Sequence, residues 1–382
     1  MKLLETQLSW FRLRRSGLVK PFASPDAAAS ALVGVQAQIL PAAALAIWNR
    51  TRGLSYPKFD SLLYEKRSLV KLWGQRGTLH IYTRDEWPLI CGALAGQRIW
   101  WERQGEQNSG SREAYTATVA RVAELLRQRG TMGRSDLRAA GLDLDSADFS
   151  SWGGIFAALV QRGYACHAGQ DGNEGQFAHR EYWLPDLEWN PPAHDEANVE
   201  LTRRYLHAYG PATMQDVMYW RGARAGDARR WLAALTNEIA EVNVGGKPML
   251  ALQSDLDALD EKPPARSEWP VRLLYRFDPL LLGLKDKAWI VDTSHYKRIF
   301  RIAGHIEGTL LERGRVAGTW RYDRKDSGLA ISLFPFSPLS ARVRKAVEEN
   351  AKGVARFFGL PLTDLTLDAG DTDGHSPGMA TD

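Results

Sequence analysis

The chain has 382 residues, of which 44% are hydrophobic and 25% charged, and its formal net charge is +4 with a pI of about 9.0. This composition is typical of a globular protein, and the length predicts two to four domains rather than one core. No apolar run approaches the ~18 residues of a membrane span and the first residues lack a signal-peptide core, so we expect a cytoplasmic protein that binds no membrane.

The sequence also lacks the common signatures of cofactor and metal binding. Cys91 and Cys166 lie far apart with different neighbours, so they cannot form a zinc cluster by themselves, and a disulfide is not expected in a reducing compartment. The eight histidines include no HExxH pair, and there is no P-loop, no GxGxxG after a strand and no Gly-x-Ser-x-Gly. We therefore expect no cofactor and no metal.

The N-terminal segment is predicted to be helical over residues 8–16, 25–35, 41–52 and 59–73, with a strand over 77–82. Ser24 is a suitable N-cap for the second helix, with Pro25 as its first residue. Pro41 disfavours a helical Leu40 and suits the start of the third helix. Between these two helices the sequence runs Gly34-Val35-Gln36-Ala37-Gln38.

Gln36 and Gln38 form a pair at this expected change in backbone conformation. Residues i and i+2 share a face in an extended segment but not in a helix, so both amides can converge on one point only if the helix ends there. We expect free N–H groups of the following helix start to face the same point, which favours an oxyanion, a polarised water or a phosphate. The alternative is two exposed glutamines at a helix end, because the spacing alone is a weak motif.

Residues 116–190 predict a winged helix-turn-helix. A helix over 116–129 ends at Gly130, a short helix follows around 137–140, and a third helix carries an apolar stripe from Trp152 to Val160. Strands over 164–168 and 176–184 flank a polar turn. Helix, turn, helix, helix and hairpin in this order are typical of a DNA-binding unit.

The same pattern repeats over residues 198–252. Its first helix breaks at Gly210, which follows Gly130 by 80 residues, and Thr213-Met214-Gln215-Asp216 echoes the segment that starts at Thr131. Helices over 198–209 and 228–240 and a hairpin around Gly245-Gly246 complete the copy. An internal repeat of a DNA-binding unit is a stronger signal than either copy alone.

The predicted fold class is therefore α+β and mainly helical, with three tandem winged helix-turn-helix units and a small C-terminal β-barrel-like domain with a closing helix. The first unit spans residues 1–110, the second 111–192 and the third 193–262. The C-terminal domain spans 263–366, with strands over 271–275, 288–291, 304–311, 316–322 and 329–334 and a helix over 339–358. Residues 367–382 are expected to be a disordered tail.

Basic clusters recur in successive segments, which is typical of a protein with a long anionic partner such as nucleic acid. Arginine in particular makes planar, bidentate phosphate contacts. The alternative is ordinary solvated helix faces with acidic neighbours. The candidate DNA contacts are Arg12, Arg14, Arg15, Arg134, Arg221, Arg224, Arg313 and Arg315. The last two belong to a predicted hairpin turn that is either a DNA probe or an ordinary solvated turn.

Four segments resemble the winged-helix family that contains the AlkZ-like DNA glycosylases. They are Gly34 to Gln38, the sequence Trp-Gly-Gln-Arg-Gly-Thr-Leu-His ending at His80, Phe-Asp-Pro-Leu-Leu-Leu-Gly ending at Gly283, and Gly-Arg-Val-Ala-Gly-Thr-Trp-Arg ending at Arg321. The resemblance covers roughly residues 5–362. It implies a curved basic surface of three winged helices, hydrolysis of the N-glycosidic bond of alkylated purines including interstrand crosslinks, and Gln36 and Gln38 as the catalytic pair.

This chemistry is consistent with two neutral amides. A glutamine cannot act as a general base near neutral pH, but it can orient a water molecule. A purine alkylated at N7 or N3 is cationic and leaves as a neutral base without protonation, so positioning and electrostatic stabilisation suffice. The sequence therefore predicts a monofunctional, monomeric DNA glycosylase of base excision repair, associated with the nucleoid and acting on double-stranded DNA with alkylated purines. The alternative is a non-enzymatic winged-helix DNA-binding protein or transcription regulator.

Two other residues have a structural alternative. His80 is either part of the site or a structural histidine bonded to the backbone. Asp278 before Pro279 is interpreted as a turn residue rather than a catalytic one.

Overall fold

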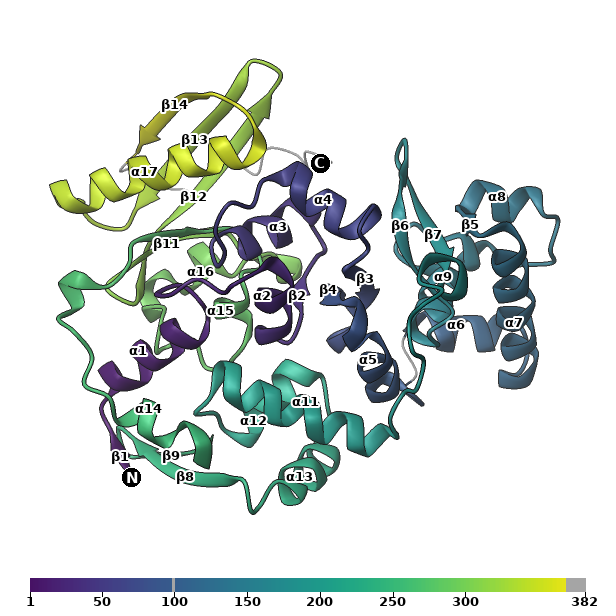
Figure 1. The fold of residues 1–382 in the computed structure, drawn as a ribbon, viewed down its shortest axis with the longest axis horizontal. Helices are drawn as coiled ribbons and strands as arrows, with labels where there is room; N and C mark the ends of the chain where they lie inside the picture. The colour runs from purple at the N-terminus through teal and green to yellow at the C-terminus, as the bar shows by residue number, and fades with distance from the viewer. Residues whose placement is uncertain (98–99, 369–382) are drawn as a thin grey trace. The chain divides into compact units, whose positions relative to one another are not determined.

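Helices dominate the chain and alternate with short sheets, so the fold is α+β and mainly helical, as predicted (Figure 1). The computed structural model describes residues 1–97 and 100–368, apart from the side chains of Trp101 and Ala303. These residues form two compact units. The first compact unit contains Met1–Phe59 and the chain from Thr202 onward, and the second compact unit contains Asp60–Leu201.

The N-terminal segment contains helices at the four predicted places, and the last three are shorter than predicted. Its elements are β1 (Lys2–Leu3), α1 (Glu5–Arg15), α2 (Pro25–Ala31), β2 (Val35–Gln36), α3 (Leu40–Trp48) and α4 (Tyr56–Tyr64). Ser24 caps α2 as expected, because its hydroxyl accepts a hydrogen bond from Ala27 N at 3.0 Å. The predicted helix over 25–35 ends at Ala31, and the chain is extended at Gln36.

The predicted helix over 59–73 is wrong in its second half. After α4, the left-handed Arg67 (φ 56°) breaks the helical path, and β3 (Leu69–Trp73) pairs antiparallel with β4 (Leu79–Thr83). Leu69, Val70, Leu72 and Trp73 are buried, so β3 is apolar on both faces. A short apolar run of this kind has no period that separates a strand from a helix.

Residues 112–179 follow the predicted order of helices and hairpin, whereas the predicted strand over 176–184 ends at His179 and continues as a short helix. The α-helices and strands from Trp87 to Trp183 are α5 (Trp87–Leu94), α6 (Trp100–Asn108), α7 (Arg112–Arg129), β5 (Thr131–Met132), α8 (Arg134–Ala139), α9 (Gly154–Gln161), β6 (Ala165–Asp171), β7 (Glu174–His179) and α10 (Arg180–Trp183). The three strands form one antiparallel sheet in the order β5-β7-β6. Gly130, at φ 80°, ends α7 as predicted.

The repeated segment has the same succession of elements. It contains α11 (His194–Tyr209), α12 (Met214–Arg221), α13 (Ala225–Ala234), β8 (Ile239–Val244), β9 (Lys247–Leu252) and α14 (Leu256–Asp260). Thr213 and Asp216 form a capping box at the start of α12. The sequence did not indicate that β1 pairs in parallel with β8 and so adds a third strand to this antiparallel hairpin, in the order β1-β8-β9.

The C-terminal segment forms an open sheet, and the expected barrel is not found among the described residues. The strands β10 (Arg272–Leu274), β11 (Gly308–Glu312), β12 (Arg315–Lys325), β13 (Gly328–Pro335) and β14 (Leu362–Leu367) pair in chain order, the last two in parallel. The predicted strand over 288–291 is a turn instead. Leu367 ends β14, whereas residues 369–382 of the expected disordered tail lie outside the described chain.

Helix α17 (Ala341–Phe358) covers this sheet and confirms the predicted closing helix. Ser340 caps it, and Val343, Val347, Val354 and Phe358 are buried as the helical period requires. The helix packs against β10, β13 and β14. Between β10 and β11 the chain forms α15 (Pro279–Leu282) and α16 (Tyr296–Ile299).

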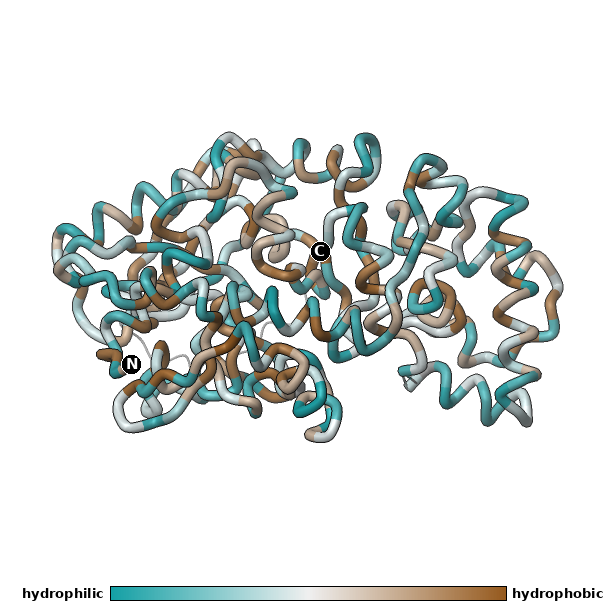
Figure 2. The backbone as a smooth tube through the Cα atoms, turned by 60° about the horizontal axis from the view of Figure 1, so that its bottom comes forward, coloured by the Kyte–Doolittle hydropathy of each residue, from teal (hydrophilic) through white to brown (hydrophobic). Residues whose placement is uncertain are grey.

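Within residues 1–97 and 100–368, no helix is long and apolar enough to cross a lipid bilayer. In Figure 2, short hydrophobic stretches alternate with hydrophilic ones along the trace.

Candidate active site

Gln36 and Gln38 lie in the short connection between α2 and α3, and they differ in exposure. Gln36 ends β2 and is 8% exposed, whereas Gln38 lies in a bend and is exposed to solvent. Ala37 between them is buried. The connection is therefore non-helical at both glutamines, as predicted, with one amide held inside the unit and the other open to solvent.

The chain reaches Gln36 through two left-handed residues. Val33 has φ 54° and Gly34 has φ 91°, and Gly34 N donates to the carbonyl of Ala29 at 3.0 Å, which closes the end of α2. Glycine adopts this backbone freely, but for a β-branched residue such as Val33 the left-handed region costs roughly 1–2 kcal/mol. Strain of this kind persists only where surrounding contacts fix the backbone, and it often lies next to functional residues.

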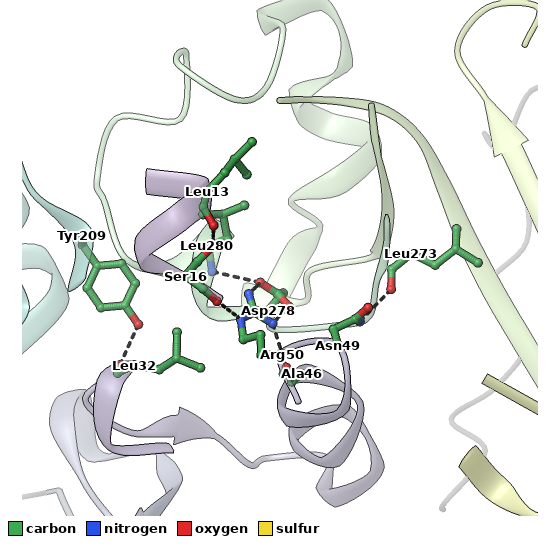
Figure 3. A network of polar contacts seen from close by, with 10 residues as sticks. All are labelled: Leu13, Ser16, Leu32, Ala46, Asn49, Arg50, Tyr209, Leu273, Asp278 and Leu280. Carbon is green, nitrogen blue, oxygen red and sulfur yellow. Dashed lines mark hydrogen bonds and ion pairs between the residues drawn. The ribbon is translucent and has the colours of Figure 1, made fainter. Parts of the chain in front are cut away.

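Contacts on both sides of the connection supply that fixation (Figure 3). Upstream, the hydroxyl of Tyr209, from α11, donates to the carbonyl of Leu32 at 2.7 Å. Downstream, the side chain of Asn49 donates to the carbonyl of Leu273 at 2.9 Å and so ties the end of α3 to β10. The glutamine pair is thus held at a defined place within the first unit.

Arg50, just after α3, forms the centre of this network. Its guanidinium donates to both carboxylate oxygens of Asp278 at 2.8 and 2.7 Å, to the carbonyl of Ser16 at 2.8 Å and to the carbonyl of Ala46 at 2.8 Å. Both side chains are completely buried. Asp278 also accepts from Leu280 N at 3.0 Å, so one carboxylate caps α15 and holds α3. This confirms the interpretation of Asp278 as a structural residue.

The helix start after Gln38 differs from the expectation of free N–H groups. Ala42 N and Ala43 N both donate to the carbonyl of Ile39, at 3.1 and 3.3 Å, and Pro41 has no N–H. These donors are already used within the first turn, so the start of α3 does not offer the row of free amides that we predicted. The side chains of Gln36 and Gln38 are left as the candidate groups of this segment.

The segment from Trp73 to His80 is a packed turn of the second unit. The hydroxyl of Tyr82 donates to Gln75 Oε1, and a Cβ on Gly74 would lie 2.1 Å from that hydroxyl, which explains the glycine. His80 is buried, and its Nδ1 lies 2.9 Å from the carbonyl of Thr78. Burial lowers the pKa of His80 to about 3, so the ring is neutral at physiological pH. His80 therefore has the structural role.

The last two segments of the resemblance are also explained by packing. A Cβ on Gly283 would lie 2.2 Å from the ring of Tyr209, and a Cβ on Gly314 would lie 2.4 Å from the ring of Trp269. Trp320 is buried, and its indole N–H donates to the carbonyl of Leu274 at 2.8 Å. The first segment differs, because the side chain of Gln38 is exposed to solvent.

Burial contradicts two of the predicted DNA contacts. Arg12 is 2% exposed and donates to the carbonyls of Tyr209 and Pro211, at 3.2 and 2.6 Å, and Arg221 is 3% exposed. Burial also lowers the pKa of Arg12 to about 10, which still leaves it protonated at neutral pH. The position of an arginine in the sequence does not show whether a helix turns its side chain inward, so the sequence alone could not separate these two from exposed arginines.

The other six arginines lie nearer to solvent. Arg14 pairs with Glu261, Arg15 pairs with Asp255, and Arg134 lies 3.8 Å from Glu174. Arg315 donates to the carbonyls of Ala288 and Trp289 at 3.2 and 3.3 Å. Arg224 is exposed, and Arg313, whose side chain is 59% exposed, occupies the turn between β11 and β12. Of the predicted contacts, Arg224 and Arg313 are the most accessible to an anionic partner.

Known proteins share this arrangement over nearly the whole chain. A protein of Streptomyces sahachiroi described as an interstrand DNA cross-link repair glycosylase is 29% identical over 380 residues, covering 94% of this chain and 98% of its own. The solved structure of the Streptomyces sahachiroi DNA glycosylase AlkZ matches with a TM-score of 0.82 and 28% identity, covering 96% of this chain and all of that chain. The profile of the family described as DNA glycosylase AlkZ-like matches residues 29–357. The chain therefore belongs to the AlkZ-like DNA glycosylases, enzymes that hydrolyse N-glycosidic bonds.

Proposed function

We propose that this protein is a monofunctional glycosylase that removes cationic N7- or N3-alkylated purines from double-stranded DNA in base excision repair. Gln36 and Gln38 position the water that attacks the sugar. The observation that carries the proposal is the Gln-x-Gln pair at an anchored, non-helical connection in a member of a DNA glycosylase family. Family membership favours this function over that of a non-enzymatic DNA-binding protein.

The absence of a carboxylate from the pair limits the substrates. Most glycoside hydrolysis uses one carboxylic acid to protonate the leaving group and one carboxylate as base or nucleophile. A cationic purine leaves as a neutral base and needs no acid, so the enzyme has only to place water and stabilise oxocarbenium-like charge. The different burial of the two amides fits this task, since the buried Gln36 is fixed while Gln38 meets solvent and substrate.

Interstrand crosslinks are the bulkiest proposed substrates. The Streptomyces sahachiroi relative is described as an interstrand DNA cross-link repair glycosylase. A base that is tied to the opposite strand cannot be flipped into a closed pocket as a single modified base can. The exposure of Gln38 supports unhooking, because a group in an open bend can reach a lesion that stays in the duplex.

DNA binding is proposed to use three tandem winged helices, over residues 1–110, 111–192 and 193–262, in a monomer. The repeated order of helices and hairpins in the last two supports this. Arg224 and Arg313 supply exposed contacts to DNA phosphates. The less exposed arginines exchange their present partners in the protein for phosphates when DNA binds, and they are Arg14, Arg15, Arg134 and Arg315. Arg12 and Arg221 are not included, because they are buried.

The test is single-turnover base release from duplexes with one N7-methylguanine, measured for wild type, Gln36→Ala and Gln38→Ala. Loss of one positioning amide is expected to slow release by roughly 100-fold or more, with unchanged DNA affinity. Gln107→Ala, at an exposed glutamine of α6, is the matched control and should behave as wild type. No release by wild type from any alkylated duplex would end the proposal, and efficient release of uracil would refute the limit to cationic bases.

A further inference from the structure

Ile302 is the most exposed of the large hydrophobic side chains in the described part of the chain. It is 94% exposed and starts the short turn Ile302–Gly304 after α16. A single exposed apolar residue is ordinary on a protein surface. Ile302 differs from such a residue in the loop that carries it and in the basic residues next to it.

The loop that carries Ile302 is closed and therefore presents the side chain at a fixed position. Phe300 and Ile306 form an antiparallel bridge, and Arg301 N donates to the carbonyl of His305 at 2.8 Å. Glu307 N also donates to the carbonyl of Ile299 at 3.0 Å, and Gly304 makes the turn at φ 78°. The tip thus projects from a hydrogen-bonded base, and ordering it on binding costs little entropy.

The base of this loop belongs to the same hydrophobic cluster as the glutamine segment. Ile299 and Ile306 are buried in a cluster against which Ile39 packs, and Ile39 directly follows Gln38. Figure 1 shows α16 and α3 in the same part of the first unit. The loop and the segment of Gln38 are therefore anchored to the same hydrophobic core.

The chain segment that carries Ile302 is rich in basic residues. From His295 to His305 the sequence contains Lys297, Arg298 and Arg301 and no acidic residue. The nearest acid along the chain, Glu307, is paired with both Arg301 and Arg321, at 3.5 and 2.9 Å. An apolar tip with a basic base matches a duplex, whose phosphates surround an apolar stack of bases.

We propose that Ile302 is a wedge that enters the base stack of duplex DNA beside the lesion and separates it, so that water held by Gln36 and Gln38 reaches the glycosidic carbon. Apolar side chains used in this way unstack one base step and expose the bases, while basic neighbours hold the backbone. Ile302 is then a positioning residue, and this role rests on the proposed glycosylase function.

The test uses a duplex with 2-aminopurine next to N7-methylguanine, whose fluorescence rises when the step is unstacked, together with single-turnover base release. Ile302→Ala should lose most of the fluorescence rise on binding and slow release from the duplex about tenfold. On the same lesion in a single strand, with no stack to open, the variant and wild type should react at equal rates. Ile302→Leu should restore both signals.

Controls separate a wedge from a structural effect. Leu4→Ala changes another exposed apolar residue and should leave both signals unchanged. The melting temperature of Ile302→Ala should equal that of wild type, because the side chain has few contacts to lose. An unchanged fluorescence rise in Ile302→Ala overturns the proposal, whatever the release rate, and leaves a protein partner as the occupant of this tip. If wild type releases no base but Ile302→Ala still loses the rise, the wedge stands and the proposed function fails.

Discussion

Arg50 and Asp278, 228 residues apart in the sequence, form a bidentate ion pair with no exposure to solvent. The pair joins α3, which starts two residues after Gln38, to the cap of α15. The place of the candidate catalytic amides therefore depends on a charge contact that is far from them in the chain.

Replacing Asp278 with asparagine should destabilise the protein strongly. The variant leaves a buried guanidinium without its counter-charge, and losing one partner of a buried pair costs about 3–5 kcal/mol. Urea unfolding of Asp278→Asn measures this loss. The exposed Asp323, 3.2 Å from Lys325, offers the matched control: Asp323→Asn should change the free energy of unfolding by less than about 0.5 kcal/mol. Equal effects of the two variants would show that the buried pair is not an anchor.

Arg12→Met should lower stability and leave DNA binding intact. It leaves the carbonyls of Tyr209 and Pro211 without their donor, which costs about 1–3 kcal/mol for each unsatisfied buried group. Unfolding experiments and DNA titrations at a temperature where the variant is folded measure the two effects separately. A weakened affinity at unchanged stability would restore Arg12 as a DNA contact.

Arg313→Gln should weaken binding to all DNA sequences alike. Removing one phosphate contact lowers the slope of log affinity against log salt concentration by about 1. Titrations at several salt concentrations measure the slope. Arg127→Gln is the control, because Arg127 is exposed but held by both oxygens of Glu124, at 2.8 and 2.7 Å, whereas Arg313 lies 3.5 Å from a single oxygen of Glu312. An unchanged slope in Arg313→Gln would identify the β11–β12 turn as an ordinary solvated turn.

The stability of the protein should fall as the pH drops below about 6.5, partly because of His80. Its pKa is about 3 in the folded protein and about 6.5 when unfolded, so between these values the unfolded chain binds more protons. The contribution of neutral His80 is complete above pH 6.5 and is lost toward pH 3, by about 1 kcal/mol between pH 6.5 and 5.5. His80→Gln should remove that part of the pH dependence. Denaturant unfolding of both proteins across this range gives the difference, and parallel curves would contradict the prediction.

Gly34→Ala should impair base release more than it impairs folding. At φ 91° a Cβ is strained by about 1–2 kcal/mol, and relief moves the backbone just before Gln36. Gly96→Ala has the same kind of backbone, φ 72°, and no atom within 4 Å of the new Cβ. Both variants should lose similar stability, whereas only Gly34→Ala should slow single-turnover release. Full activity of Gly34→Ala would show that the entry to Gln36 needs no left-handed glycine.

Local features of the structure could be predicted because their causes are local. Ser24 caps α2 through a hydroxyl three residues from its donor, and the spacing of Val343, Val347, Val354 and Phe358 sets the buried face of α17. Pro41 and Gly34 likewise place the change of backbone conformation at Gln36 and Gln38.

The wrong predictions concern segments whose state depends on distant neighbours. β3, predicted as helix, is a strand because β4 supplies its hydrogen bonds, and Leu362–Leu367, for which no strand was predicted, is a strand because β13 does. A short apolar run in the sequence does not indicate which strand will pair with it.

The sequence by itself indicated the family and the class of chemistry, and it predicted the glutamine pair as the candidate site, since these depend on residue types and short spacings. Only the tertiary structure decided that Arg12 and Arg221 are inside, that Asp278 neutralises Arg50, and that Ile302 is exposed on a loop whose base shares a hydrophobic cluster with Ile39. The physical reason is that the free energy of a charge or an apolar group depends on what surrounds it, and those surroundings come from parts of the chain that lie far apart in sequence.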